Sequence, residues 1–298
     1  MTQLDRSHIE NTFAAYAARY NSDDPKIALK IEHTYKVAQM SEEIARSISV
    51  PEAAAQSNAP EGAAQANAPE GAAPAGVPVP DLAWVCGMMH DIGRFEQVTR
   101  YGTFSDADSV DHAGLGADLL FREGLIGDYF PEAGAETDDS VGAGTENGVT
   151  AWLTSDRRAL LELAVRSHSL YRLPEGLTQE ETMYCNILRD ADKVDIFRVN
   201  TETPLEDIYN VSTAELKASG LSEEVKRCFL EKHTVLRAYK KLPADFVVGH
   251  ICLAFELIYP KSRELAKEQG YINKLLAFES DDPDTRRFFE YMRAHIWA

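Results

Sequence analysis

Apolar residues recur at steps of three and four along most of this 298-residue chain, and strict alternation is almost absent. Steps of three and four mark one face of an α-helix, whereas alternation marks a half-buried strand. The clearest stripe consists of Ile27, Ile31, Val37, Met40, Ile44 and Ile48. The spacing therefore predicts an all-α fold.

Polar residues that can accept backbone N–H groups predict where helices begin. Asp81, Asp111 and Ser155 each precede an apolar stripe and are expected to cap a helix. Residues 183–199 are apolar on several faces, as in a buried central helix. Further helices are expected over residues 222–240, 244–269 and 282–295.

Two segments differ from this helical pattern. Residues 51–80 contain an imperfect nine-residue duplication, QSNAPEGAA and QANAPEGAA, rich in Ala, Pro, Gly and Glu, which predicts a disordered insertion. Residues 131–150 contain five acidic and no basic residues, which predicts an acidic loop. We therefore expect one helical domain over residues 1–220 with two insertions, and C-terminal helices over residues 221–298 packing on it.

The charge of the chain limits its partners. Its 30 Lys and Arg residues against 48 Asp and Glu residues give a formal net charge of −18. Nucleic acid is therefore not expected as a scaffold partner, and an anionic substrate would need local cations or metal ions.

The cysteines and the hydropathy pattern predict a cytoplasmic location. The four cysteines are far apart and form no CxxC pair, so the sequence suggests neither a disulfide framework nor a cysteine zinc site. The charged N-terminal residues are unlike a signal peptide, and no apolar run approaches the ~18 residues of a membrane span. No membrane partner is expected.

Histidines and carboxylates gather on the apolar helices. His33 lies on the stripe of residues 27–48, His90 and Asp91 end an apolar helix, His112 follows Asp111, and His168 lies four residues after Ala164. Residues 189–195 (RDADKVD) add three carboxylates within an apolar helix. Burying so many ionisable groups without compensation would be costly, and a metal centre would compensate them together.

This number of imidazole and carboxylate groups exceeds what one ion needs. Two ions about 3.5 to 4 Å apart can activate a shared water and stabilise a leaving oxygen. A carboxylate next to a ligand histidine is placed to bridge them, which favours Asp91.

The order of His33, then His90-Asp91, then a later Asp192 resembles the HD domain superfamily of metal-dependent phosphohydrolases, which have a helical core. The motifs ALKIEHTYKVA, HDIGRF and RDADKVD carry the resemblance, which covers residues 27–199 apart from the insertion after Pro51. Two intervening histidines mark the dinuclear members. The resemblance implies a ligand set of His33, His90, Asp91, His112, His168 and Asp192, with Asp91 bridging. Asp190 and Asp195 remain open as alternatives to Asp192.

Differences from better-known subfamilies narrow the range of expected substrates. The chain has HSLYRLP where cyclic di-GMP phosphodiesterases carry a second histidine and a Gly-Tyr-Pro motif, and it lacks the Glu-Asp pair of the guanosine tetraphosphate hydrolases. Arg94, Gln97 and Arg100 are instead expected to bind substrate, since arginine can hold a phosphate through two hydrogen bonds. Lys193 is placed with Asp91 in the catalytic set, as a further cation that can neutralise an anion.

The sequence therefore predicts hydrolysis of a small phosphomonoester or nucleotide, with two divalent ions among Mn, Fe, Zn, Ni and Mg activating a bridging water. One alternative is a di-iron oxygenase similar to myo-inositol oxygenase, which uses the same six-ligand set. Another is a sensor that binds metal without turnover. The C-terminal helices could cover the site or form a dimer interface, so a homo-oligomer remains open.

Overall fold

A computed structural model describes residues 3–48, 78–131, 152–209 and 211–298. The described residues form helices joined by turns and contain no strand, which confirms the all-α fold. No helix among them is both long and apolar enough to cross a membrane. Most of each expected insertion, residues 51–77 and 132–150, lies outside the described residues.

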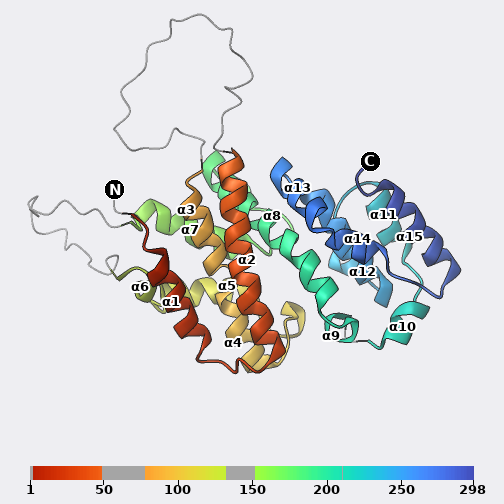
Figure 1. Cartoon of the computed structure of the whole chain (residues 1–298), viewed down its shortest axis with the longest axis horizontal. Coiled ribbons are helices and arrows are strands. Elements are labelled where there is room, and N and C mark those ends of the chain that lie inside the picture. Colours follow the sequence, from red (N-terminus) through yellow and green to blue (C-terminus); the bar gives the residue numbers. More distant parts are fainter. Residues whose placement is uncertain (1–2, 49–77, 132–151, 210) are drawn as a thin grey trace, which may run out of the picture. The chain divides into compact units, whose positions relative to one another are not determined.

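The chain forms two compact units, residues 1–188 and 189–298, and helix α8 (Gln179–Glu202) runs from the first into the second. The domain boundary expected near residue 220 stays a prediction. The other helices of the first unit are α1 (Arg6–Ala17), α2 (Pro25–Ile48), α3 (Pro80–Met89), α4 (Ile92–Tyr101), α5 (His112–Ala117), α6 (Ile126–Tyr129) and α7 (Ser155–Ser167) (Figure 1).

Two glycines allow helices of the first unit to approach closely. A Cβ atom on Gly87 of α3 would lie 2.4 Å from the Cα atom of Ala38 on α2. A Cβ atom on Gly93 of α4 would lie 2.2 Å from the carbonyl oxygen of His112, the first residue of α5. Figure 1 shows α3 running beside α2. These contacts hold α3 against α2 and the first turn of α4 against the start of α5.

An aromatic cluster packs α1 against α4. Phe13 and Tyr16 meet Phe95 edge to face, with ring centroids 5.9 and 5.7 Å away. The Tyr16 hydroxyl donates a hydrogen bond to the carbonyl oxygen of Ile92 at 3.1 Å. This bond fixes the first turn of α4, which follows Asp91 directly.

Of the three residues predicted to cap helices, one does so in the structure. Asp111 caps α5 and accepts hydrogen bonds from the N–H groups of Ala113 and Gly114, as predicted. The predictions for Asp81 and Ser155 were wrong. Pro80 begins α3, so Asp81 lies within the first turn, where it pairs with Arg6. Thr154, rather than Ser155, caps α7.

The second unit contains more breaks than the sequence predicted. After α8 its helices are α9 (Leu205–Tyr209), α10 (Thr213–Ala218), α11 (Glu223–Leu230), α12 (Pro243–Cys252), α13 (Pro260–Gln269), α14 (Tyr271–Leu276) and α15 (Pro283–His295). The single helices expected over 222–240 and 244–269 were wrong. Lys232 has a positive φ of 56° just after α11, and Pro260, which has no N–H group, starts a new helix. Asp282 caps α15 close to its expected start.

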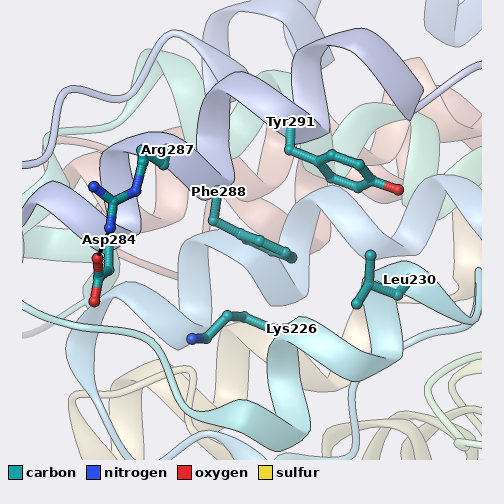
Figure 2. A pocket seen from close by; sticks show the side chains of 6 residues that line it. All are labelled: Lys226, Leu230, Asp284, Arg287, Phe288 and Tyr291. Atoms are coloured by element: carbon teal, nitrogen blue, oxygen red, sulfur yellow. Dashed lines mark hydrogen bonds and ion pairs between the residues drawn. The ribbon is translucent and has the colours of Figure 1, made fainter.

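Helices α11 and α15 border a groove in the second unit (Figure 2). Leu230, Phe288 and Tyr291 form its apolar part, and Arg287 pairs with Asp284 beside it. Leu230 and Tyr291 are among the large exposed apolar side chains of this unit.

Candidate metal centre

Five of the predicted ligands come together in the first unit, each at or near a helix end or on a buried helix face. His33 lies on α2, His90 and Asp91 occupy the break between α3 and α4, His112 begins α5, and His168 directly follows α7. None of the five is more than 5 % exposed. Such burial of polar groups requires partners.

The Nε2 atoms of the four histidines surround the carboxylate of Asp91 in two pairs. His33 and His90 face its Oδ2 atom at 3.5 and 3.4 Å. His112 and His168 face its Oδ1 atom at 3.5 and 3.7 Å. Each oxygen of Asp91 therefore belongs to its own three-residue group, and Asp91 is common to both groups.

Within each pair the nitrogens lie unusually close. The Nε2 atoms of His112 and His168 are 3.0 Å apart, and those of His33 and His90 are 3.3 Å apart. Nδ1 of His168 donates a hydrogen bond to the carbonyl oxygen of Val165 at 2.7 Å. Nδ1 of His90 donates to the carbonyl oxygen of Gly87, also at 2.7 Å. A neutral imidazole that donates from Nδ1 carries a lone pair on Nε2. These lone pairs point at a neighbouring imidazole and at a carboxylate, an arrangement that a cation between them would stabilise.

The spacing of the nitrogens fits a shared metal ion. Two imidazole nitrogens bound to one ion at about 2.1 Å lie about 3.0 to 3.4 Å apart when the angle between them is about 90 to 110°. Both pairs meet this condition. The donor set of imidazoles and a carboxylate also suits divalent first-row ions. The residues of the first unit thus form two groups that share Asp91, and each group could hold a metal ion.

The electrostatics favour the metal-binding protonation states of Asp91 and His112. Burial alone would raise the pKa of Asp91, but Lys30, His90 and His168 outweigh it and place the pKa well below the usual range. Burial and the nearby Arg94 lower the pKa of His112 to about 4, although Asp106 opposes them. At neutral pH Asp91 is therefore ionised and His112 is neutral, which are the forms that bind metal.

Asp106 is a residue of the centre that the sequence did not reveal. Its Oδ2 atom accepts a hydrogen bond from Nδ1 of His112 at 2.7 Å, while its Oδ1 atom accepts from Arg94 and Gln97 at 2.9 and 2.8 Å. A carboxylate behind a ligand histidine fixes its tautomer and orientation. Asp106 lies in a single turn of 3-10 helix with no apolar periodicity, so no sequence signal pointed to it.

Lys30 is the second residue that the sequence did not reveal. Its Nζ atom lies 2.6 Å from Oδ2 of Asp91, and the side chains of the pair are only 13 % and 2 % exposed. One signal could have identified it, because Lys30 precedes His33 by one helical turn and lies on the same face of α2.

The three predicted substrate-binding residues on α4 have different surroundings. The Nε atom of Arg94 is buried without a hydrogen-bond acceptor, 3.7 Å from Oδ1 of Asp91. Gln97 is fully buried, and its amide group binds Arg94 and Asp106 and so braces the loop before α5. Arg100 is exposed and pairs with Glu96. Substrate contacts by all three stay predictions.

The remaining predicted residues lie on the part of α8 that belongs to the second unit. Lys193 is nearly buried, and its Nζ atom lies 3.4 Å from Glu256. Burial and the neighbouring Arg189 lower its pKa. Asp192 is partly buried, and its role as the sixth ligand stays a prediction, as does the catalytic role of Lys193.

The two alternatives to Asp192 have structural partners. Asp190 accepts hydrogen bonds from the N–H groups of Ile258 and Tyr259 at 2.8 and 3.0 Å, just before α13. Asp195 forms two hydrogen bonds of 2.8 Å with Arg198. Both carboxylates therefore stabilise the second unit.

Comparison with known proteins gives one match. A family model described as HD domain matches residues 31–196, which is more than half of the chain and includes all six predicted ligands. No curated protein sequence matches the chain significantly, and neither does any solved structure.

Proposed function

We propose that this chain, which belongs to the HD domain family, hydrolyses a phosphate ester with two divalent metal ions held on either side of Asp91. The family is one of metal-dependent phosphohydrolases. The observation that carries the proposal is the pairing of two imidazole Nε2 atoms with each oxygen of this one carboxylate.

Asp91 is the central residue of the proposed centre. Bound divalent ions supply Lewis acidity and make water nucleophilic at neutral pH. His33 and His90 would hold one ion and His112 and His168 the other, while Asp91 contacts both. Asp192 is proposed as the sixth ligand. The lowered pKa of Asp91 keeps its carboxylate charged for this task.

Arg94 is the strongest candidate for binding the phosphate group. Its guanidinium is held by Asp106, Gln97 and the carbonyl oxygen of Phe104, which all accept from Nη1. Its Nε atom has no acceptor. A buried N–H donor without a partner is costly, so an anionic oxygen of a ligand beside Asp91 would satisfy it. The proposed substrate class is a small phosphomonoester or nucleotide.

The test combines metal content with hydrolysis. We expect about two ions per chain in the purified wild-type protein, fewer in His112→Ala, and metal-dependent release of phosphate from a panel of small phosphomonoesters and nucleotides. Asp91→Ala should abolish that hydrolysis because it removes the carboxylate common to both groups, and His90→Ala should abolish it because it removes a ligand of one group. His8→Ala is the matched control, since His8 binds the carbonyl oxygen of Asp128 outside the centre.

Three results would contradict the proposal: hydrolysis that survives in Asp91→Ala, a protein that binds no divalent ion, or a mixed-valent iron pair in a protein that hydrolyses no phosphate ester.

A further inference from the structure

The closest cationic contact of Asp91 is made by Lys30. The 2.6 Å separation between Nζ and Oδ2 is that of a charge-assisted hydrogen bond. Both side chains are largely removed from water, so solvent screens this pair less than an exposed ion pair.

Lys30 shares its acceptor with two predicted ligands. Oδ2 is also the oxygen that His33 and His90 face at 3.5 and 3.4 Å. An ion bound by these three groups would stand next to the ammonium of Lys30, and two cations at such a distance repel each other strongly where water is scarce. The ammonium and the ion therefore compete for the same oxygen.

The ammonium of Lys30 lies beside an aromatic ring while it contacts Asp91. Its Nζ atom lies 5.4 Å from the centre of the Phe104 ring, and the guanidinium of Arg94 lies 5.7 Å from the same ring. An aromatic face attracts cations, and the flexible lysine stem can rotate. A small rotation would release Asp91 while the ammonium stays beside Phe104.

We propose that Lys30 is the internal counter-ion of Asp91 in the metal-free protein, and that metal binding displaces its ammonium from Oδ2. Lys30 then stabilises the centre before metal binds and lowers the affinity of the centre for metal. This inference rests on the metal centre of the proposed function, but it concerns metal binding rather than hydrolysis.

The test is a titration of the metal-free protein with Mn²⁺, in which electron paramagnetic resonance measures the free ion. Lys30→Met removes the ammonium and keeps a stem of similar length, and Lys30→Gln keeps a hydrogen-bond donor without the charge. We expect both to bind the tightest Mn²⁺ about tenfold more strongly, which corresponds to about 1.4 kcal/mol. We also expect the metal-free variants to melt at a lower temperature than the wild type. Lys30→Arg should restore wild-type behaviour.

The matched control is Lys36→Met, which removes the same charge from the same helix. The side chain of Lys36 is 40 % exposed and pairs with Glu32 rather than with Asp91. Its removal should change neither the Mn²⁺ affinity nor the metal-free melting temperature to the extent that Lys30→Met does.

The outcomes separate this inference from the proposed function. Unchanged or weaker Mn²⁺ binding would overturn the role of Lys30 if the circular dichroism spectrum of Lys30→Gln matches that of the wild type, because a damaged fold is then excluded as the cause. If Lys30→Met folds only when Mn²⁺ is added, the counter-ion role is supported directly. A wild-type protein that binds no Mn²⁺ would contradict the metal centre itself.

Discussion

Asp106 connects three side chains around the centre. It accepts hydrogen bonds from His112, Arg94 and Gln97. Burial by itself would raise the pKa of Asp106, but the hydrogen bond from His112 and the charge of Arg94 outweigh it and lower the pKa to about 2. The carboxylate is therefore negative at neutral pH and faces the imidazole that would bind metal.

The substitution Asp106→Ala should weaken metal binding without removing a ligand. His112 would lose the acceptor that fixes its Nδ1 proton, and loss of such a partner typically costs 10- to 100-fold in metal affinity. The measurement is Mn²⁺ titration of the folded variant. Asp108→Ala is the control, because Asp108 is exposed in the same turn. Equal Mn²⁺ affinity of the two variants would show that Asp106 does not support His112.

The sequence identified the candidate metal ligands better than the residues that hydrogen-bond to those ligands. His33, His90, Asp91, His112 and His168 could be predicted because histidines and carboxylates on apolar helix faces are costly unless they bind something. Lys30 and Asp106 were not predicted, because lysine and aspartate are common on exposed surfaces. Their roles depend on where the fold places Asp91 and His112.

At the scale of helices, the position of the centre depends on close backbone contact between α4 and α5. A Cβ atom at Gly93 would lie 2.2 Å from the carbonyl oxygen of His112 and 2.6 Å from the backbone nitrogen of Gly116. These neighbours are backbone atoms, so they cannot rotate away as a side chain could. Gly93 thus sets the distance between Asp91 and His112.

Gly93→Ala should destabilise the protein and disturb the centre together. Overpacking typically costs about 1–3 kcal/mol, and the backbone contact places this change at the upper end. We expect a lower free energy of unfolding in urea and weaker Mn²⁺ binding. Gly127→Ala is the control, because a Cβ atom there meets nothing within 4 Å. If Gly93→Ala were as stable as Gly127→Ala, the close contact between α4 and α5 would be wrong.

Helix boundaries were predictable over residues 27–48 and 282–295 but not over residues 244–269. Residues 27–48 formed a helix almost as expected, since α2 covers Pro25–Ile48. The region 244–269 was expected to be one helix, but it divides into α12 and α13. Its apolar spacing continues through the break, and the carboxylate of Asp190, distant in sequence, accepts the N–H groups that the break exposes at Ile258 and Tyr259. Such a tertiary contact leaves no local sequence pattern.

For the molecule as a whole, the net charge of −18 is the dominant electrostatic property. Like charges repel more strongly in a compact chain than in an expanded one, so a large net charge destabilises the folded state. The exposed ion pairs of the described residues, such as Arg100 with Glu96, contribute little in return. Screening should therefore relieve more repulsion than attraction.

Added NaCl should accordingly stabilise the metal-free protein. Raising its concentration from about 20 to 200 mM shortens the Debye length from about 20 to 7 Å, which screens charges across the surface. We expect the melting temperature to rise by a few degrees, as measured by circular dichroism with a chelator present. Glu290→Gln removes one exposed negative charge, so it should also raise the melting temperature at low salt. A melting temperature that falls with NaCl would mean that attractive surface pairs outweigh the net repulsion, because only then would screening remove more stabilisation than it adds.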